Sequence, residues 1–188
     1  MGFALLIGAV FLPTMANASR AAEAFIRDRA VKVVAVLNSA ESIERKRDEL
    51  SALVDENVDI QRIAYYTLGS YRASANAGDL DRYVAAFKDY LFAYYIKPAA
   101  GFSGIALTVT GTIDLPEGRG SLVQTVAKTP SSVELDWYVL GDSSIVDVEI
   151  AGFSAAKLLR AQVIAVLALN GGKISAATSL LETLVKRT

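Results

Sequence analysis

The feature that most constrains the fold of this chain is a change in the spacing of its apolar residues near Gly104. Before Gly104, apolar residues recur every three or four positions, which is the period of an amphipathic helix. After Gly104, they alternate with polar residues over short segments, which is typical of β-strands. From Ala155 onward the helical spacing returns. Helices at both ends with a block of strands between them predict an α+β fold.

The block of strands predicts a meander. Four strands are expected, at 105–113, 122–128, 133–139 and 146–150, separated by turns rich in Gly, Pro and Asp. Short connections imply antiparallel pairing, because parallel strands need long crossovers. We therefore predict one α+β domain with a four-stranded antiparallel meander sheet, packed against N-terminal and C-terminal helices and enclosing an apolar pocket. In this pattern Ile113 points inward, and the acidic residues Asp136, Asp147 and Glu149 point outward to water.

The helices follow from periodicity and capping residues. Ile43, Leu50 and Val54 form one stripe through the charged run 44–49, which we interpret as a solvated helix face. Asp79, Ser154 and Ser175 are the expected N-caps of the three later helices, because short polar side chains satisfy free N–H groups there. The other segments expected to be helical are 21–37, 60–68, 80–94 ending near Lys97-Pro98, 155–169 and 176–186.

The first eighteen residues resemble a secretory signal. Phe3 to Leu12 is apolar, Pro13 follows, and Ala16-Asn17-Ala18 offers a peptidase site before Ser19. The apolar stretch is shorter than the roughly 20 residues that span a bilayer. We therefore expect residues 1–18 to be a signal peptide and residues 19–188 to be the mature single domain; the alternative is a buried N-terminal helix.

Composition excludes several classes of function. The chain has 19 basic and 20 acidic residues, a net charge of −1, so it lacks the basic field that nucleic-acid binding requires. It has no Cys and no His, which removes disulfides, thiol catalysis and the commonest metal ligands and general bases. It also lacks a nucleophile elbow, a P-loop and a dinucleotide-binding motif. We expect no enzymatic activity, cofactor or metal site, although catalysis by carboxylates alone stays open.

Aromatic residues are concentrated on one predicted helix. Within thirteen positions it carries Tyr83, Phe87, Tyr90, Phe92, Tyr94 and Tyr95. These rings can form a solid core, or they can line a cavity that leaves the tyrosine hydroxyls near its opening. A later segment, 163–169, is apolar on every side, which is typical of a helix that is buried all round or that faces an apolar ligand.

The order of these elements and of several dispersed motifs resembles the MlaC family of periplasmic phospholipid-binding proteins, also called toluene-tolerance auxiliary proteins. The motif residues that carry the resemblance, across roughly 24–184, are Asp55, Ile63, Ala64, Leu68, Gly69, Tyr71, Phe87, Tyr90, Leu91, Asp136, Trp137, Asp147, Val148, Ile150, Gly152, Ser154, Arg160, Gly171 and Gly172. The chain departs from the family pattern at Tyr71, where Trp is common, at 142–145, where Gly-x-Trp-Lys-Ile is usual, and at Phe153, where Val is common.

The resemblance implies a periplasmic lipid carrier. In such a protein an apolar pocket holds the acyl chains, and the lipid passes between an outer-membrane lipoprotein complex and an inner-membrane ABC transporter with an MCE-domain protein. The family that this chain resembles has a related branch associated with hopanoid lipids, which the sequence leaves open as an alternative. We expect a monomer that binds phospholipid or a related lipid and no nucleic acid.

For a carrier, the predicted pocket residues come from three parts of the chain. They are Leu68, Phe87, Leu91 and Tyr94 from the early helices, Leu107, Val109, Trp137, Val139 and Val148 from the sheet, and Val163 and Leu167 from the late helix. Lys97, Arg72 and Arg82 are the basic residues considered for a phosphate at the opening. Two other classes stay open: a small α+β enzyme with a carboxylate base, and an adaptor domain whose aromatic helix is solid core.

Overall fold

The computed structural model describes residues 15–128, 131–141 and 143–188. The predicted turn residues Thr129, Pro130 and Asp142 lie outside these ranges. So do the first fourteen residues of the predicted signal peptide, and the first described helix begins at Met15.

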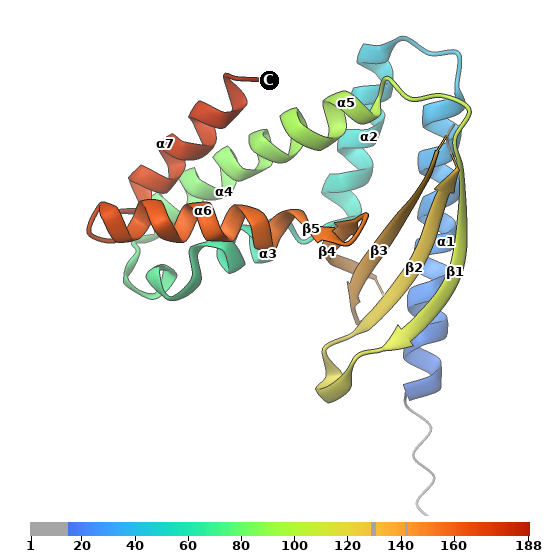
Figure 1. The fold of residues 1–188 in the computed structure, drawn as a ribbon, viewed down its shortest axis with the longest axis horizontal. Helices are drawn as coiled ribbons and strands as arrows, with labels where there is room; N and C mark the ends of the chain where they lie inside the picture. Colours follow the sequence, from blue (N-terminus) through green and yellow to red (C-terminus); the bar gives the residue numbers. More distant parts are fainter. Residues whose placement is uncertain (1–14, 129–130, 142) are drawn as a thin grey trace, which may run out of the picture.

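The helices form two groups around the sheet (Figure 1). One helix, α1, lies along a face of the sheet, and α2 lies beside it, whereas α3, α4, α6 and α7 form a bundle that extends to one side. The bounds are α1 Met15–Asn38, α2 Ile43–Asn57, α3 Ile60–Leu68, α4 Ala77–Leu91, α5 Lys97–Ala99, α6 Ala155–Leu169 and α7 Ile174–Val185, with short 3-10 turns at Gly69–Ser74 and Pro116–Gly118.

The sheet is an antiparallel meander, as predicted, in the order β1-β2-β3-β4-β5. Its strands are β1 Ala106–Asp114, β2 Ser121–Lys128, β3 Ser132–Leu140, β4 Ser144–Ile150 and β5 Phe153–Ser154. The prediction of four strands was one short, because the two-residue β5 turns back at Ala151-Gly152 and pairs with the end of β4. This hairpin leads directly into α6.

Two β-bulges change which side chains face inward. In β1 the register shifts between Val109 and Gly111, so the alternation reverses, and Ile113 is 50% exposed instead of buried. In β4 the register shifts near Val146, and Ile145 takes the inward position that simple alternation assigns to Val146. A bulge inserts one unpaired residue, and strict period-two counting fails beyond it.

Helix ends agree with the predictions only in part. Ser154 caps α6 by accepting a hydrogen bond from the Lys157 backbone N–H at 3.0 Å. At α4 the cap is Asn76 instead of Asp79, and α7 begins after Lys173 without a side-chain cap, so Ser175 lies inside it. The aromatic helix ends close to the predicted stop near Lys97-Pro98: it runs through a π-helical turn at Phe92–Ile96 into α5, which ends at Ala99.

The interior consists of three separate hydrophobic cores. The bundle core contains Tyr83 and Phe87 from one face of α4 and Leu159 from α6. A second core joins α1 to the sheet through Ile26 and Val139, and a small third core joins the end of α1 to α2 and the start of β1. Separate cores indicate that the elements do not close fully on one another where these cores meet.

The helix α6 is not buried all round, contrary to one reading of its sequence. Val163 and Leu167 are fully buried, but Leu169 is 86% exposed and Leu158 is also exposed. Within the described ranges, none of the helices has the length and apolar content that crossing a membrane requires.

Candidate functional site

An apolar cavity of about 680 Å³ lies between the sheet and the helices. Its walls come from nearly every part of the fold: α1, α2, the aromatic helix and its π-helical turn, the inward face of the sheet, and the first turns of α6. The volume is within the range of roughly 300 to 1,000 Å³ that small-molecule sites occupy. A solid aromatic core, which the sequence left open, would not contain such a space.

The cavity lies where the three cores meet. Ile26 and Ile145 of the sheet core, Leu37 and Ile105 of the third core, and Phe87 of the bundle core all contribute to its wall. Each core holds its own elements together, so the space between them does not have to be filled for the chain to fold. The architecture therefore separates structural packing from the cavity.

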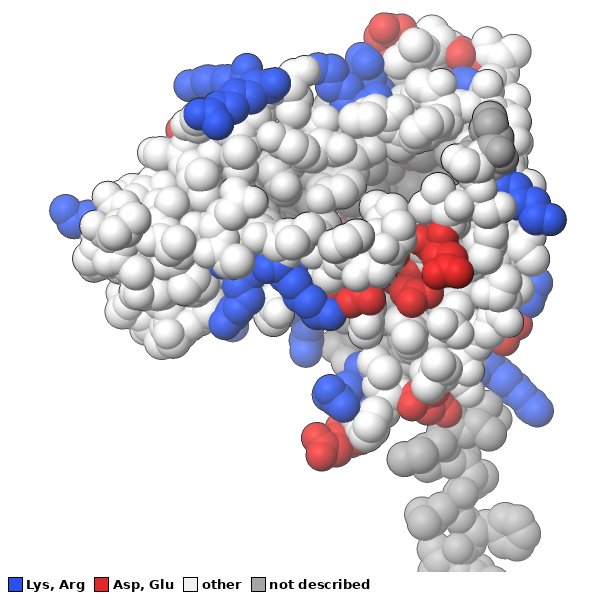
Figure 2. Space-filling view, viewed as in Figure 1, with Lys and Arg blue, Asp and Glu red and all other residues white. Residues whose placement is uncertain are grey.

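The cavity opens between the connection that follows α5 and the outer part of the sheet. The lining residues that are exposed to solvent are Pro98, Phe102, Ser131 and Ile150, and we call this opening the mouth. The space-filling view shows a hollow there, beside basic side chains that gather over α5 (Figure 2). Phe102 is 55% exposed, so an apolar ring stands at the entrance.

Six of the predicted pocket residues line this cavity. They are Phe87, Leu91, Tyr94, Leu107, Trp137 and Val148.

The other five lie elsewhere, which corrects their expected positions. Leu68, Val163 and Leu167 are fully buried in the bundle core, where α3 packs against α6. Val109 and Val139 belong to the core under α1, because α1 covers that part of the sheet face. The prediction that these side chains point inward was right, but each of them faces another helix and not the cavity.

Most of the cavity wall that α1 and α2 contribute was not predicted from the sequence. The lining residues from these helices are Ile26, Arg29, Ala30, Val33, Val34 and Leu37 from α1, and Leu50, Leu53, Val54, Asn57 and Val58 at and after α2. Their spacing of three, four and seven positions is a helical stripe that the sequence contains. The predicted stripe on α2 was partly right, since Leu50 and Val54 line the cavity, whereas Ile43 is exposed.

The charged run on α2 is more than a solvated face. Lys46 is buried, and its Nζ donates a hydrogen bond to the Leu37 backbone carbonyl at 2.9 Å, near the end of α1. Asn38, at the end of α1, exchanges hydrogen bonds with both backbone groups of Ile105, at 2.8 and 2.9 Å. These contacts hold α1, α2 and the start of β1 together at one end of the cavity.

A cluster of tyrosines forms the wall contributed by the aromatic helix. The Tyr90 and Tyr94 rings lie 4.6 Å apart between centroids, and Tyr95 meets Tyr90 edge-on at 6.4 Å. Burial raises the pKa values of both Tyr90 and Tyr95, and their mutual proximity adds to the shift at Tyr90. The π-helical turn at Phe92–Ile96 widens the backbone here, so that 94, 95 and 96 all reach the cavity.

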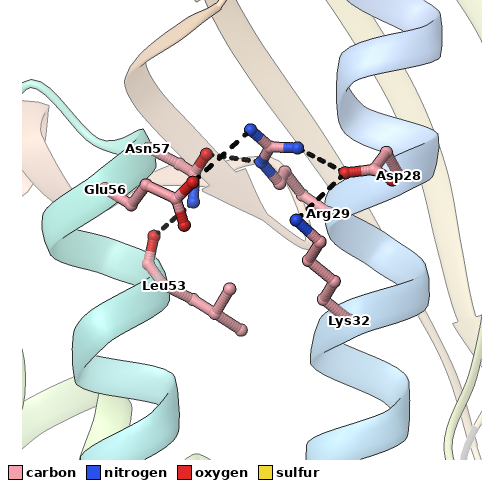
Figure 3. Close-up of polar contacts among 6 residues, drawn as sticks. All are labelled: Asp28, Arg29, Lys32, Leu53, Glu56 and Asn57. Atoms are coloured by element: carbon pink, nitrogen blue, oxygen red, sulfur yellow. Dashed lines mark hydrogen bonds and ion pairs between the residues drawn. The ribbon is translucent and has the colours of Figure 1, made fainter.

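Polar side chains in the wall are few and are engaged with one another. Arg29 on α1 donates a hydrogen bond from Nε to Asn57 Oδ1 on α2, and its guanidinium pairs with Asp28 and, at 3.9 Å, with Glu56 (Figure 3). Asn57 in turn donates to the Leu53 carbonyl at 2.6 Å. The group therefore ties α1 to α2 across the wall and leaves the space itself apolar.

Asp147 lies on the same face of β4 as Glu149, as the alternation predicts, but it is half-buried instead of open to water. It is the one carboxylate among the described lining residues, and burial raises its pKa. Its Oδ1 accepts a hydrogen bond from the Val148 N–H at 2.9 Å, and its Oδ2 accepts one from the Ser154 hydroxyl at 2.7 Å. Because both oxygens are engaged with the backbone and the α6 cap, the carboxylate holds β4, β5 and the start of α6 in register.

Several of the motif residues have clear structural roles. Gly69 has a φ of 59°, and a Cβ there would lie 2.9 Å from the Arg160 guanidinium, which donates to the Tyr66 carbonyl. Asp55 pairs with Lys88 between α2 and α4 at 2.7 Å. Trp137 donates from Nε1 to Thr125 Oγ1 at 2.9 Å, across the inward face of the sheet.

The arrangement is suited to binding and contains little that is suited to bond-making chemistry. Across the described residues, no group of three or more acidic side chains gathers in an arrangement that could hold a metal ion. The carboxylates Asp136 and Glu149 do not line the cavity, and Glu149 pairs with Lys157 at 2.6 Å.

Comparison with known proteins supports the same view of the fold. The model of the family described as MlaC protein matches residues 27–183. A search of curated proteins found no match. The structure is similar to that of a phospholipid-binding protein from Ralstonia solanacearum, solved in complex with a phospholipid, with a TM-score of 0.77 and 16% identity, covering 88% of this chain and 97% of that one. Since the family model spans most of the chain, this protein belongs to the MlaC family.

Proposed function

We propose that this protein is a periplasmic lipid carrier that holds the acyl chains of a phospholipid in the cavity of about 680 Å³. The observation that carries the proposal is the cavity itself, whose wall is formed almost entirely by aliphatic and aromatic side chains from all parts of the fold. The headgroup would stay at the mouth, where the cavity meets solvent.

An apolar wall of this extent meets the main energetic requirement of a carrier. Burying one methylene is worth about 0.8 kcal/mol, so two chains of about 15 carbons represent roughly 24 kcal/mol that exposure to water would forfeit. A carrier must match most of this amount, or the lipid remains in the bilayer. A large apolar surface supplies it, whereas a few hydrogen bonds do not.

The comparisons support a lipid as the ligand. The chain belongs to the MlaC family, and the similar structure from Ralstonia solanacearum is that of a phospholipid-binding protein in complex with a phospholipid. A hopanoid or another apolar molecule is the alternative ligand class, because an apolar wall discriminates weakly among apolar molecules of similar size.

The transport role is part of the proposal. The protein would receive and deliver lipid as the soluble component of an ABC transport system, between an outer-membrane lipoprotein complex and an inner-membrane transporter with an MCE-domain protein. Residues 1–18 would direct export and be removed, and residues 19–188 would act as a monomeric lipid-binding domain.

Native mass spectrometry of protein purified gently from cells tests the binding role. We expect a mass above that of the chain, by an amount that matches a lipid and disappears when the complex is activated in the gas phase. A lipid-free mass, together with no uptake from phospholipid vesicles, would contradict the proposal. An added mass that matches a hopanoid would instead identify the ligand as the alternative class.

One observation favours a second candidate function. Asp147 is a carboxylate with a raised pKa in a cavity, and such a group can act as a general base. Its two oxygens already accept hydrogen bonds from Val148 and Ser154, which favours a structural role. If Asp147→Asn takes up as much lipid as the wild type and neither protein releases fatty acid from it, the enzyme hypothesis is excluded for that lipid.

A further inference from the structure

Large apolar side chains are exposed around the mouth of the cavity. Phe102 lies on the connection that follows α5, and Ile150 ends β4; both line the cavity and reach solvent. Phe153, in β5, is 67% exposed. We call these three residues the rim. Exposed apolar residues that occur singly need no explanation, whereas a group of them around an opening is typical of an interaction surface.

The pairing of β4 with β5 brings Phe153 to the mouth. Phe153 is the Cα partner of Ile150 in this antiparallel pair, and the side chains of such partners lie on the same face of a sheet. Ile150 belongs to the inward face, because its partner on the other side is Leu135, which also lines the cavity. Phe153 therefore extends the apolar wall of the cavity beyond β4 and into solvent.

The tip of this hairpin carries no polar side chain. Ala151 and Gly152 join the two strands, and both have a positive φ, 52° and 80°. Two-residue turns of this kind favour Asn or Asp at the first position, because most other side chains are strained at positive φ. Alanine accepts this strain and leaves the tip apolar. The Ala151 N–H donates a hydrogen bond to the Glu134 carbonyl at 2.9 Å, which holds the tip against β3.

The charged residues next to the hairpin in the chain neutralise one another. Residues 150–156 include no charged side chain. Glu149, just before them, pairs with Lys157, just after them, at 2.6 Å. Moving this hairpin toward an apolar phase therefore does not require the desolvation of an isolated charge, which is the costliest step in such a transfer.

A local structural role explains Phe153 only in part. It precedes the Ser154 cap of α6, and Leu158 follows at the position where a hydrophobic staple has its second residue. Packing in a staple shields part of each side chain, yet both Phe153 and Leu158 are more than half exposed. Most of the Phe153 ring is therefore available to a partner.

We propose that the rim contacts the surface of a lipid bilayer directly, with Phe102 and Phe153 entering the boundary between headgroups and acyl chains. The contact rests on the proposed function for its cargo, and it adds a membrane interaction that needs no protein partner. With the rim seated in this way, the apolar wall of the cavity is continuous with the interior of the bilayer. Acyl chains can then pass between the two without crossing water.

The arrangement of the rim favours a bilayer over a protein as its partner. The rim residues come from two separate connections and stand beside a hollow, so they form no continuous surface (Figure 2). A stable protein interface buries about 1,200 Å² or more of complementary surface. A bilayer, in contrast, adapts to the side chains that enter it, and aromatic rings are favoured at its interface with water.

A label at the rim tests insertion into a membrane. The chain has no Cys, so Phe153→Cys and Ile113→Cys can each be labelled at one position with the polarity-sensitive dye NBD. Ile113 is the matched control, because it is an exposed apolar residue of the sheet that does not line the cavity. With phosphatidylcholine vesicles in about 0.5 M NaCl, which screens charges, we expect the emission to shift to shorter wavelength only for the label at position 153.

Flotation of unlabelled variants with the same vesicles measures the contribution of the ring. We expect Phe153→Ser to bind about tenfold more weakly than the wild type, because it removes most of one apolar side chain from the contact. Phe153→Leu should keep most of the binding, and Ile113→Ser should bind as the wild type does. Circular dichroism of each variant confirms that it is folded.

The outcomes separate the membrane contact from the proposed function. If the label at position 153 does not respond and Phe153→Ser binds as the wild type does, the membrane contact is wrong, and lipid in the purified protein leaves the carrier standing. If the rim inserts but the protein retains no lipid from cells or vesicles, the carrier fails and the membrane contact stands. If the wild type forms a dimer in sedimentation that Phe153→Ser abolishes, a second copy covers the rim and the assignment to a bilayer is overturned.

Discussion

Arg29 on α1 and Asn57 on α2 form a hydrogen bond that joins two helices across the wall of the cavity. Asn57 is buried, so its carboxamide depends on protein groups for its hydrogen bonds. The two helices approach one another mainly through side chains that also border an open space. This contact and the bond from Lys46 to the Leu37 carbonyl therefore both help to keep the wall closed.

Replacing Arg29 with Met tests that role. The change keeps the apolar length of the side chain but leaves Asn57 Oδ1 without its donor, which costs about 1–3 kcal/mol for a buried group. We expect the midpoint of urea denaturation to fall accordingly and bound lipid to dissociate faster. As a control, Arg27→Met removes an exposed pair with Glu23 and should change stability by less than about 1 kcal/mol. Equal losses in the two variants would contradict the prediction.

Filling the cavity should block lipid uptake without unfolding the protein. Leu91 borders the cavity, and the larger indole of Leu91→Trp would extend into a space that is empty of protein. We expect little retained lipid after incubation with phosphatidylglycerol vesicles and an unchanged circular dichroism spectrum. Leu158→Trp, at an exposed position of α6 away from the cavity, should retain wild-type lipid. Wild-type loading of Leu91→Trp would show that the lipid binds elsewhere.

The buried hydroxyl pair in the bundle core should contribute measurably to stability. Thr67 Oγ1 lies 2.6 Å from both the Ala64 carbonyl and the Tyr83 hydroxyl. Since Thr67 has one hydroxyl proton and uses it toward Ala64, Tyr83 is the donor to Thr67. Burial also raises the pKa of Tyr83 to about 12.

We expect Tyr83→Phe to lower the free energy of unfolding by about 1 kcal/mol, because it removes this bond. Tyr66→Phe is the matched control, since the Tyr66 ring is largely exposed and its stacking with Arg160 does not need the hydroxyl. A difference between these variants of less than a few tenths of a kcal/mol would argue against the assigned bond.

The acidic face of the sheet should make stability depend on pH. Burial, followed by repulsion from Glu149 and Glu134, raises the pKa of Asp136 above its ordinary value of 3.8. The folded state therefore binds this proton more tightly than the unfolded state, and charging Asp136 costs stability as the pH rises through the folded-state pKa.

Asp136→Asn should remove that cost. We expect the variant to be more stable than the wild type at pH 7, by less than about 1 kcal/mol because Asp136 is only partly buried. The difference should vanish below pH 3.8, where Asp136 is protonated in both states, and should shrink in high salt. Thermal melts from pH 3 to pH 8 measure it. A variant that is less stable than the wild type at pH 7 would contradict the sign.

One glycine of the family motif should be strictly required. Gly69 has a φ of 59°, and a Cβ there would also lie 3.0 Å from Ile164. We expect Gly69→Ala to destabilise the protein by about 1–3 kcal/mol, through backbone strain and crowding of α6. Gly78→Ala is a useful contrast. Gly78 lies in α4, and a Cβ added there would have no atom closer than 3.5 Å, so the substitution should stabilise the helix by about 0.4–1 kcal/mol.

Local patterns in the sequence predicted most of the fold. The bounds of α6 and its Ser154 cap agree exactly with the prediction, because capping and helical periodicity act within a few residues of one another. The meander was predicted for the same reason, from alternation and short turns. The predicted inward and outward faces were wrong where one extra residue shifts the alternation along a strand, as at the bulges near Gly111 and Val146.

The candidate site was predictable only in part. Phe87, Leu91 and Trp137 line the cavity as expected, but Leu68, Val109 and Val163 are equally apolar and lie in solid cores. Periodicity identifies the buried side of an element without identifying what that side faces. The contribution of α1 and α2 was missed for this reason, since their apolar stripes resemble those of any helix packed on a core.

The sequence by itself determined the elements, their order, their buried faces and the family, because each of these depends on residue type and short-range spacing. Only the tertiary structure decided that the three cores stop short of one another and leave a cavity between them. It also brought Asp55 and Lys88 together as an ion pair between α2 and α4, although they are distant in the chain. Cavities and paired charges depend on how elements pack at long range, and no local pattern of residues encodes that distance.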